Sequence, residues 1–292
     1  MKNLKKQPDI ILLLEIIEST QNLIKIIEEE ILYKVKSPSM IHKNIYQIEI
    51  YEKLEFLFES IVHHVEAVIN IAIGAINSNN PLLVNSALAI IRVILETSAR
   101  IYWLSEKSGN ISELLIRYRK VLTQDKVSFE EYAKRYIGFE KSQKKAIEEN
   151  IDILTKQIGN LDQEIKKLNN LDEITKLTKL PSPKELVENF DCFLNIKYNK
   201  EHNDICLYYM STSKIVHGMS PVIYTLVNES RTPACEWNIT FKICFSMLEE
   251  CSNILFDLRS INNDMFYKKL QSIKLRFFTA SEKIEKMKKE SL

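Results

Sequence analysis

The sequence predicts an all-α protein, a helical bundle into which an antiparallel helical or coiled-coil arm is inserted. Glycine and proline are scarce, with 5 and 7 residues in a chain of 292. The intervals between them are rich in Leu, Ile, Lys, Glu and Asn, which is typical of long helices with few turns. Apolar residues recur at helical spacing, and no segment alternates in the manner of a strand. A heptad repeat in the middle of the chain predicts the arm.

The bulk composition is that of a globular protein and limits the classes of partner. The chain is 45% hydrophobic and 27% charged, and 292 residues suffice to bury a sizeable core. A formal net charge of +1 gives no global attraction for nucleic acid or anionic membranes, so such binding would need a local patch. The five cysteines form no C-x-x-C pair, and their odd number favours reduced thiols and a cytoplasmic location.

Turn residues mark the helices that precede the arm and the helix that begins it. These helices are expected over about 9–33, 44–77, 81–108 and 112–137. The first ends before "KSPSM", and the second ends where Asn79 and Asn80 suit capping positions before Pro81. The third ends before Gly109, and Ser112 suits the N-cap of the fourth.

Helices are also expected after the prolines at 181 and 183. Helical periodicity returns in "KELVENFDCFLNIK", "NDICLYYMSTSKIVH" and "CEWNITFKICFSMLEECSNILFDLRS", and "KLRFFTASEKIEKMKKESL" is a basic, amphipathic last helix. Near the start of the chain, the apolar run from Ile10 to Leu14 is broken by Glu15. It is far shorter than the roughly 20 residues that a membrane span needs, so no membrane partner is expected.

The clearest periodic signal lies within 142–170. Apolar residues step alternately by four and three through Ile147, Ile151, Leu154, Ile158, Leu161, Ile165 and Leu168. Ile151, Ile158 and Ile165 take heptad position a, which favours a parallel homodimer through this segment. Alternatively, the segment folds back on the preceding helix. That helix carries Tyr118, Val121, Leu122, Phe129, Tyr132 and Tyr136. In either case 1–110 and 181–292 form a helical body and 111–180 the arm.

One predicted helix, "PLLVNSALAIIRVILETSARIYWL", is apolar around most of its circumference. Asn85, Arg92, Glu96, Arg100 and Trp103 fall in one stripe that is about 80° wide, and Arg92, Glu96 and Arg100 are spaced i, i+4 and i+8. The stripe is either a solvent window whose ion pairs contribute little or an internal polar site. In an internal site, arginine presents its planar fork to a phosphate or carboxylate.

A histidine stands where one helix is predicted to end and the next to begin, in "STSKIVHGMSP". Gly218 suits a helix C-terminus, and Ser220 and Pro221 suit the start of the next helix. His217 is then either a cap, which gains from the helix dipole, or an acid–base group, because its ordinary pKa lies near neutrality.

The Arg-x-x-x-Glu helix "RVILETSARIYWL" and the Ser-x-x-x-His helix end "YYMSTSKIVHG" together resemble a group of uncharacterised all-helical bacterial proteins near the HEPN superfamily. The resemblance implies a HEPN-like bundle, often dimeric, of the kind found among toxins and antiviral defence systems. Many such proteins are metal-independent ribonucleases without a cofactor, so RNA is the implied substrate. The HEPN Arg-x(4–6)-His motif itself is not matched, because Thr212 stands five residues before His217. By resemblance, Arg92 replaces the missing arginine from a different helix.

RNA cleavage without a metal needs a base, an acid and a cation that holds the phosphorane charge. The catalytic residues expected are His217 as base or acid, Arg92 as the cation, and Glu96 as the group that orients the arginine or the imidazole. The substrate-binding residues expected are Tyr209, Ser213, Lys214 and Arg100. Tyr209 and Ser213 precede His217 on its helix face, where they would donate hydrogen bonds or stack a base.

Other motifs are weaker. Glu59, His63 and Glu66 share one helix face and could contribute metal ligands, but a matching set on a second helix is not evident, so no metal is expected. There is no Gly-rich phosphate loop, zinc spacing or dinucleotide fingerprint, so no cofactor is expected. The alternative function is a non-catalytic helical interaction or scaffold protein, whose partner is a second copy or another helical protein.

Overall fold

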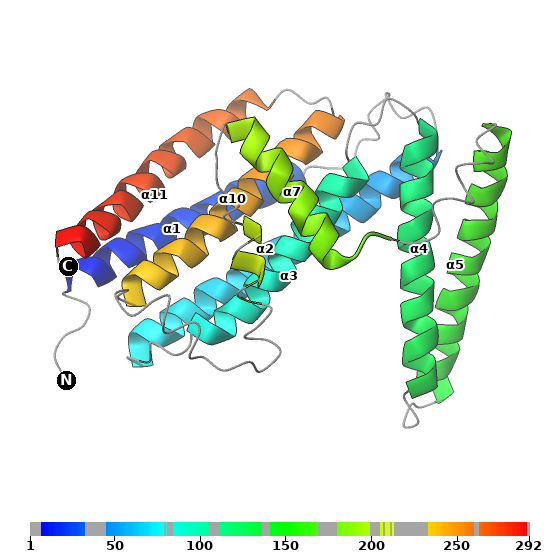
Figure 1. Ribbon diagram of the computed structural model, residues 1–292, viewed down its shortest axis with the longest axis horizontal. Coiled ribbons are helices and arrows are strands. Elements are labelled where there is room, and N and C mark those ends of the chain that lie inside the picture. Colours follow the sequence, from blue (N-terminus) through cyan, green and yellow to red (C-terminus); the bar gives the residue numbers. More distant parts are fainter. Residues whose placement is uncertain are drawn as a thin grey trace. The chain divides into compact units, whose positions relative to one another are not determined.

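The structure is a computed structural model that describes residues 7–32, 45–78, 80, 84–105, 111–135, 141–168, 180–198, 205–206, 208–210, 212, 233–259 and 263–290. The prediction of an all-α fold is confirmed, because the regular structure in these ranges is entirely helical. The helices are α1 (Pro8–Ile27), the π-helical turn η2 (Glu28–Leu32), α2 (Ile45–Ser78), α3 (Val84–Ser105), α4 (Ile111–Arg135), α5 (Lys141–Lys167), α7 (Pro183–Tyr198), α10 (Pro233–Arg259) and α11 (Asp264–Glu290) (Figure 1).

The chain divides into two compact units. The first consists of Met1–Trp103 and Pro183–Leu292, and the second of Leu104–Ser182. The division differs from the boundaries expected from the sequence, at 110 and 181, in that the last residues of α3 are grouped with the second unit.

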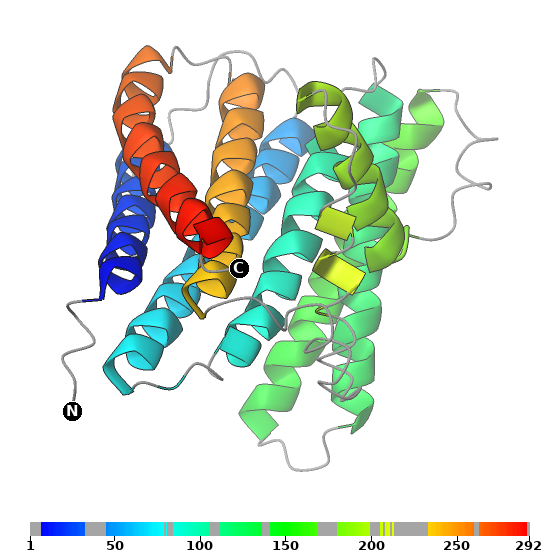
Figure 2. The same ribbon diagram turned by 60° about the vertical axis from the view of Figure 1, so that its left-hand side comes forward.

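The core of the first unit lies among α1, α2, α10 and α11. α1 packs along both α11 and α10, and Figures 1 and 2 show these three helices side by side. Phe245 of α10 and Phe277 of α11 are fully buried, with ring centroids 4.4 Å apart. Each such buried ring contributes roughly 1.5–3 kcal/mol of hydrophobic stabilisation. The amphipathic C-terminal helix therefore belongs to the core, and it begins at Asp264, ten residues before the segment that the sequence marked as the last helix.

α1 begins and ends with local features that the sequence partly signals. Pro8 occupies its first turn, and the Asp9 carboxylate accepts the Ile10 N–H at 2.9 Å. At its end the helix widens into η2, where Glu30 is buried and accepts a hydrogen bond from Lys269 of α11 at 2.9 Å. Helical periodicity predicted a continuous helix here and gave no sign of the wider turn.

α2 is the longest helix described, and most of it is strongly apolar. Within the described residues, Glu49–Ser78 is the one stretch long and apolar enough to cross a membrane, by length and composition alone. Core helices pass the same test, and α2 packs against α10 and α1 with Ile61, Val65 and Val68 fully buried. The packing favours a core helix, while the absence of a membrane partner and the cytoplasmic location stay predictions.

In the second unit, α5 packs antiparallel against α4. Arg119 near the start of α4 forms a two-bonded ion pair with Asp162 near the end of α5. Of the heptad residues, Ile147, Leu161 and Ile165 are buried, whereas Leu168 is exposed. This is the within-chain alternative, and self-association remains a prediction.

On α4, the apolar face is shorter than the sequence suggested. Tyr118, Val121 and Leu122 are buried, but Phe129 and Tyr132 are exposed. The fully buried part of the α4 face therefore ends before these last two residues, and their packing against α5 stays a prediction. Tyr136 lies outside the described residues.

Candidate functional site

α3 provides the platform for the candidate site. Its side chains Ile91, Ile94 and Leu95 are fully buried, which fixes the orientation of the helix within the first unit. Arg92 and Glu96 project from the less apolar side, and the Arg92 Nε donates a hydrogen bond to Glu96 Oε1 at 2.9 Å. Their side chains are 21% and 29% exposed, so solvent reaches this pair from one side.

Tyr209 joins the pair from a segment far along the chain. Its hydroxyl donates to Glu96 Oε1 at 2.9 Å, and the Arg92 guanidinium lies 5.6 Å from the centre of its ring. Tyr209 is only 5% exposed. We call Arg92, Glu96 and Tyr209 the Arg–Glu–Tyr cluster; it combines an ion pair, a charged hydrogen bond and a cation–π contact.

Short contacts hold the segment that carries Tyr209. The Thr212 hydroxyl donates to the Tyr209 carbonyl at 2.8 Å, and Tyr208 and Thr240 of α10 share a hydrogen bond of 3.2 Å between their hydroxyls. The Cys206 N–H donates to the buried Asp191 carboxylate of α7 at 3.3 Å. The position of the Tyr209 ring against α3 is thus set by contacts with both α7 and α10.

The electrostatics of the cluster keep its donors protonated. The hydrogen bond to Glu96 raises the pKa of the Arg92 guanidinium. Burial, followed by the hydrogen bond to Glu96, raises the pKa of the Tyr209 phenol above its usual value. Because Oε1 of Glu96 accepts both bonds, Oε2 is left without a hydrogen bond from the described residues, so it can accept one from a ligand.

Of the two arginines that flank Glu96 on α3, Arg92 forms an ion pair with it and Arg100 does not. Arg100 lies one turn beyond Glu96 and is half-buried. In the part of the chain that the structure describes, Glu96 pairs with Arg92, and Arg100 forms no ion pair. A cation on a helix that packs into the core, with no carboxylate of its own, can bind a phosphate or carboxylate.

The remaining predicted site residues cannot be placed. Ser213, Lys214 and His217 lie outside the described residues, as does the side chain of Asn85. The structure therefore brings together Arg92, Glu96 and Tyr209, and leaves the role of His217 as a prediction.

The residues weighed as metal ligands do not converge in the described ranges. Glu59 and His63 are exposed on α2 and Glu66 is half-buried. No group of three or more His, Cys, Asp or Glu side chains is placed to hold a metal ion among the residues that the structure describes. His64 on the same helix is half-buried, and its Nδ1 donates to the Ser60 carbonyl at 2.5 Å.

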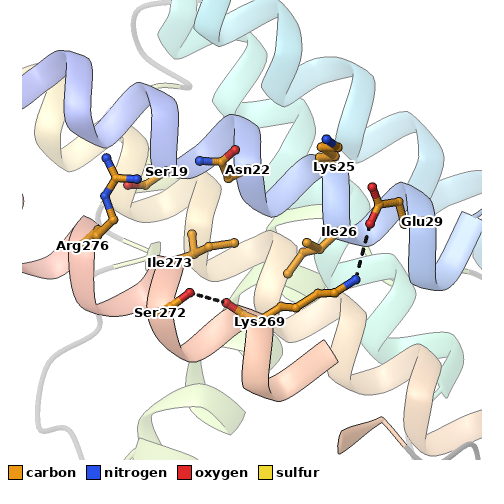
Figure 3. A pocket seen from close by; sticks show the side chains of 9 residues that line it. All are labelled: Ser19, Asn22, Lys25, Ile26, Glu29, Lys269, Ser272, Ile273 and Arg276. Carbon is orange, nitrogen blue, oxygen red and sulfur yellow. Dashed lines mark hydrogen bonds and ion pairs between the residues drawn. The ribbon is translucent and has the colours of Figure 1, made fainter. Parts of the chain in front are cut away.

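A groove of about 370 Å³ between α1 and α11 is a second polar feature (Figure 3). Lys25, Lys269 and Arg276 line it. Lys269 is 3.5 Å from Glu29, and Arg276 is 3.2 Å from Glu18. Carboxylates of η2 and α1 already neutralise Lys269 and Arg276, so these two ion pairs join the helices that line the groove.

The contact between Asp191 and Cys206 was not predicted from the sequence, because a bond from a side chain to a backbone N–H across a connecting segment leaves no periodic pattern.

Comparisons of the chain with protein-family models, curated proteins and solved structures gave no match.

Proposed function

We propose that this chain is a HEPN-like bacterial defence or toxin protein that acts on RNA as a metal-independent ribonuclease. The observation that carries the proposal is the pairing pattern along α3. Glu96 neutralises Arg92, whereas Arg100 forms no ion pair with the described residues. This favours Arg100 as the group that binds a backbone phosphate, with Arg92 as a second, fixed guanidinium about 12 Å away along the helix axis.

The proposed reaction divides the labour among the predicted residues. His217, as general base, removes the proton of a ribose 2′-hydroxyl, whose oxygen attacks the adjacent phosphorus. The 5′-oxygen leaves and takes up a proton from water, which gives a 2′,3′-cyclic phosphate and a 5′-hydroxyl. Arg100 stabilises the charge on the phosphorane. Glu96 holds Arg92, and its Oε2 is the acceptor that orients the imidazole or a ribose hydroxyl.

Cleavage of a single-stranded RNA oligonucleotide in the presence of EDTA tests the proposal. His217→Ala and Arg100→Gln are each expected to reduce the rate by about 10²-fold or more, with little change in Tm, because they remove transition-state contacts rather than packing. Arg276→Gln is the matched control, since this exposed arginine is neutralised by Glu18. Wild-type protein that leaves RNA intact, or Arg100→Gln as active as Arg276→Gln, would contradict the proposal.

A non-catalytic helical interaction protein is the second candidate, and the burial of Tyr209 favours it. A tyrosine that is 5% exposed and bonded to α3 behaves as a structural tie between distant segments. In this case Arg92→Ala lowers stability by about 1–3 kcal/mol, and the protein does not bind RNA. Fluorescence anisotropy with labelled RNA separates the two. Binding that weakens in Arg100→Gln supports the first candidate, and no binding by wild type supports the second.

A further inference from the structure

Three large apolar side chains are exposed at one level of the α4–α5 pair, whose helices lie side by side (Figure 1). Phe129 and Tyr132 of α4 are 36% and 46% exposed, and Ile153 of α5 is 56% exposed. The ion pair between Arg119 and Asp162 fixes the register of the two antiparallel helices. Counted from that pair at 1.5 Å per residue, Ile153 lies within about 6 Å of the level of both aromatic residues.

Tyr132 and Ile153 also lie on the same side of the helical pair. On α5, the ion-pair carboxylate lies about 60° to one side of the buried Ile165, and Ile153 lies about 120° to the other. On α4, the ion-pair guanidinium lies about 60° to one side of the buried Leu122, and Tyr132 lies about 80° to the other. Because the two ion-pair groups meet on one side, Tyr132 and Ile153 share the opposite side.

Uncharged residues extend this side along α5 in alternating steps of three and four. They are Gln143, Ala146, Asn150, Ile153, Gln157 and Asn160, all exposed except the half-buried Gln157. The charged residues of the same stretch all lie outside this stripe, at Lys144, Lys145, Glu148, Glu149, Asp152 and Lys156. On α4 the uncharged surface ends at Asp125, which is half-buried. We call the α5 stripe, together with Phe129 and Tyr132, the uncharged flank.

The uncharged flank is distinct from the heptad surface of α5. Leu161 and Ile165 of that surface are buried in the packing of α5 against α4. A parallel homodimer through the same heptad residues would require α5 to leave α4. Association of two chains that keep the α4–α5 pair intact therefore needs another surface.

We propose that the uncharged flank binds the same flank of a second copy of this chain. A two-fold interface places a surface against itself, so a charge near the axis would meet a charge of the same sign. Asn150 can pair with its counterpart because an amide both donates and accepts hydrogen bonds. Tyr132 and Ile153 supply apolar contact. Few charges and exposed aromatic rings are typical of the centre of a protein interface, whereas nucleic acid or another charged partner would find no complementary charge here.

The size of the flank sets the strength of the expected dimer. The stripe from Gln143 to Asn160 is about 26 Å long, and two helices side by side are about 20 Å wide, which gives roughly 500 Å² per copy. Stable interfaces bury about 800 Å² per partner. We therefore expect a reversible dimer with a dissociation constant in the micromolar range. This inference is independent of RNA cleavage.

Sedimentation velocity of the full chain between about 1 and 100 μM tests the inference, because the dimer fraction should rise with concentration. Ile153→Lys puts two lysines close together near the middle of the interface and should raise the dissociation constant about tenfold or more. Thr155→Lys is the matched control, since Thr155 is exposed on the same helix but turned about 160° away from Ile153. Its dissociation constant should equal that of wild type. Circular dichroism and Tm of both variants should match wild type, because both positions are exposed.

Three results would overturn the inference. The first is a wild-type chain that stays monomeric over the whole concentration range. The second is a dimer that Ile153→Lys leaves unchanged, which would place the interface elsewhere, and the third is equal weakening by Ile153→Lys and Thr155→Lys. Weakening by Ile153→Lys alone, with Tm preserved, supports the uncharged flank as the interface.

Discussion

In the α4–α5 pair, apolar side chains repeat along two continuous helices, whereas the Arg–Glu–Tyr cluster joins positions 113 residues apart through single polar contacts. In the pair, the stabilisation is distributed over several buried residues, among them Leu161 and Ile165. The cluster depends on one oxygen atom, Glu96 Oε1, which accepts both of its hydrogen bonds. Repetition makes a structure tolerant of exposed exceptions such as Leu168, while convergence on one atom makes the cluster sensitive to a single substitution.

The largest effect is expected from a cavity in the helical pair. Leu161 is fully buried at heptad position d, so Leu161→Ala should lower the free energy of unfolding by about 2–5 kcal/mol through lost burial and a residual void. Urea denaturation monitored by circular dichroism measures this. Ile153→Ala is the control, because Ile153 is exposed on the same helix and its truncation should cost about 0.5 kcal/mol or less. Equal effects of the two substitutions would mean that heptad burial does not hold the pair together.

A smaller but more concentrated loss is expected at Glu96. Glu96→Ala removes the acceptor of both Arg92 and Tyr209, and the half-buried guanidinium and buried phenol left without it should cost about 1–3 kcal/mol. Glu149→Ala is the matched control, since Glu149 makes an exposed i, i+4 pair with Lys145 worth about 0–1 kcal/mol. The same denaturation experiment compares them. A Glu96→Ala protein as stable as the control would show that the cluster is not a structural tie.

The smallest effect is a dependence on pH. Since burial raises the folded-state pKa of Tyr209 above 10.0, the phenol contributes stability that is present below pH 10 and is lost as pH rises through the folded value. Tyr209→Phe should therefore be less stable than wild type by about 1 kcal/mol at pH 8, with a difference that shrinks above pH 10. Thermal unfolding at pH 8, 9, 10 and 10.5 measures it. A constant difference across this range would contradict the assignment.

The parts of the fold that the sequence predicts are those in which apolar residues recur at regular local spacing. Helical periodicity located α2 and α10 closely, and the heptads identified the face of α5 that buries Leu161 and Ile165. The heptad pattern could not distinguish helix pairing within the chain from pairing between chains, because both bury the same residues. Apolar spacing also gave no sign that burial along α4 ends before Phe129 and Tyr132, which are exposed.

The sequence predicted residues of the candidate site but not how they pair. The stripe on α3 singled out Arg92, Glu96 and Arg100, and Tyr209 was named from a different helix. Spacing alone could not identify Arg92 as the partner of Glu96, because on an isolated helix an acid that precedes its base by four residues has the better orientation, which favours Arg100. In the described structure Glu96 pairs with Arg92, and the Tyr209 ring lies against that arginine. Arg100 has no ion-pair partner among the described residues.

The π-helical turn at the end of α1 has a consequence for the ancestry of the chain. A π turn is equivalent to an ordinary α-helix with one residue inserted, and such turns persist where the insertion improves a contact. Here the wider turn places Glu30 inward, opposite Lys269 of α11. Homologues that lack the inserted residue are therefore expected to be one residue shorter between the positions of Ile27 and Leu32. Those with the shorter helix should have lost the lysine on the facing helix together with the buried acid.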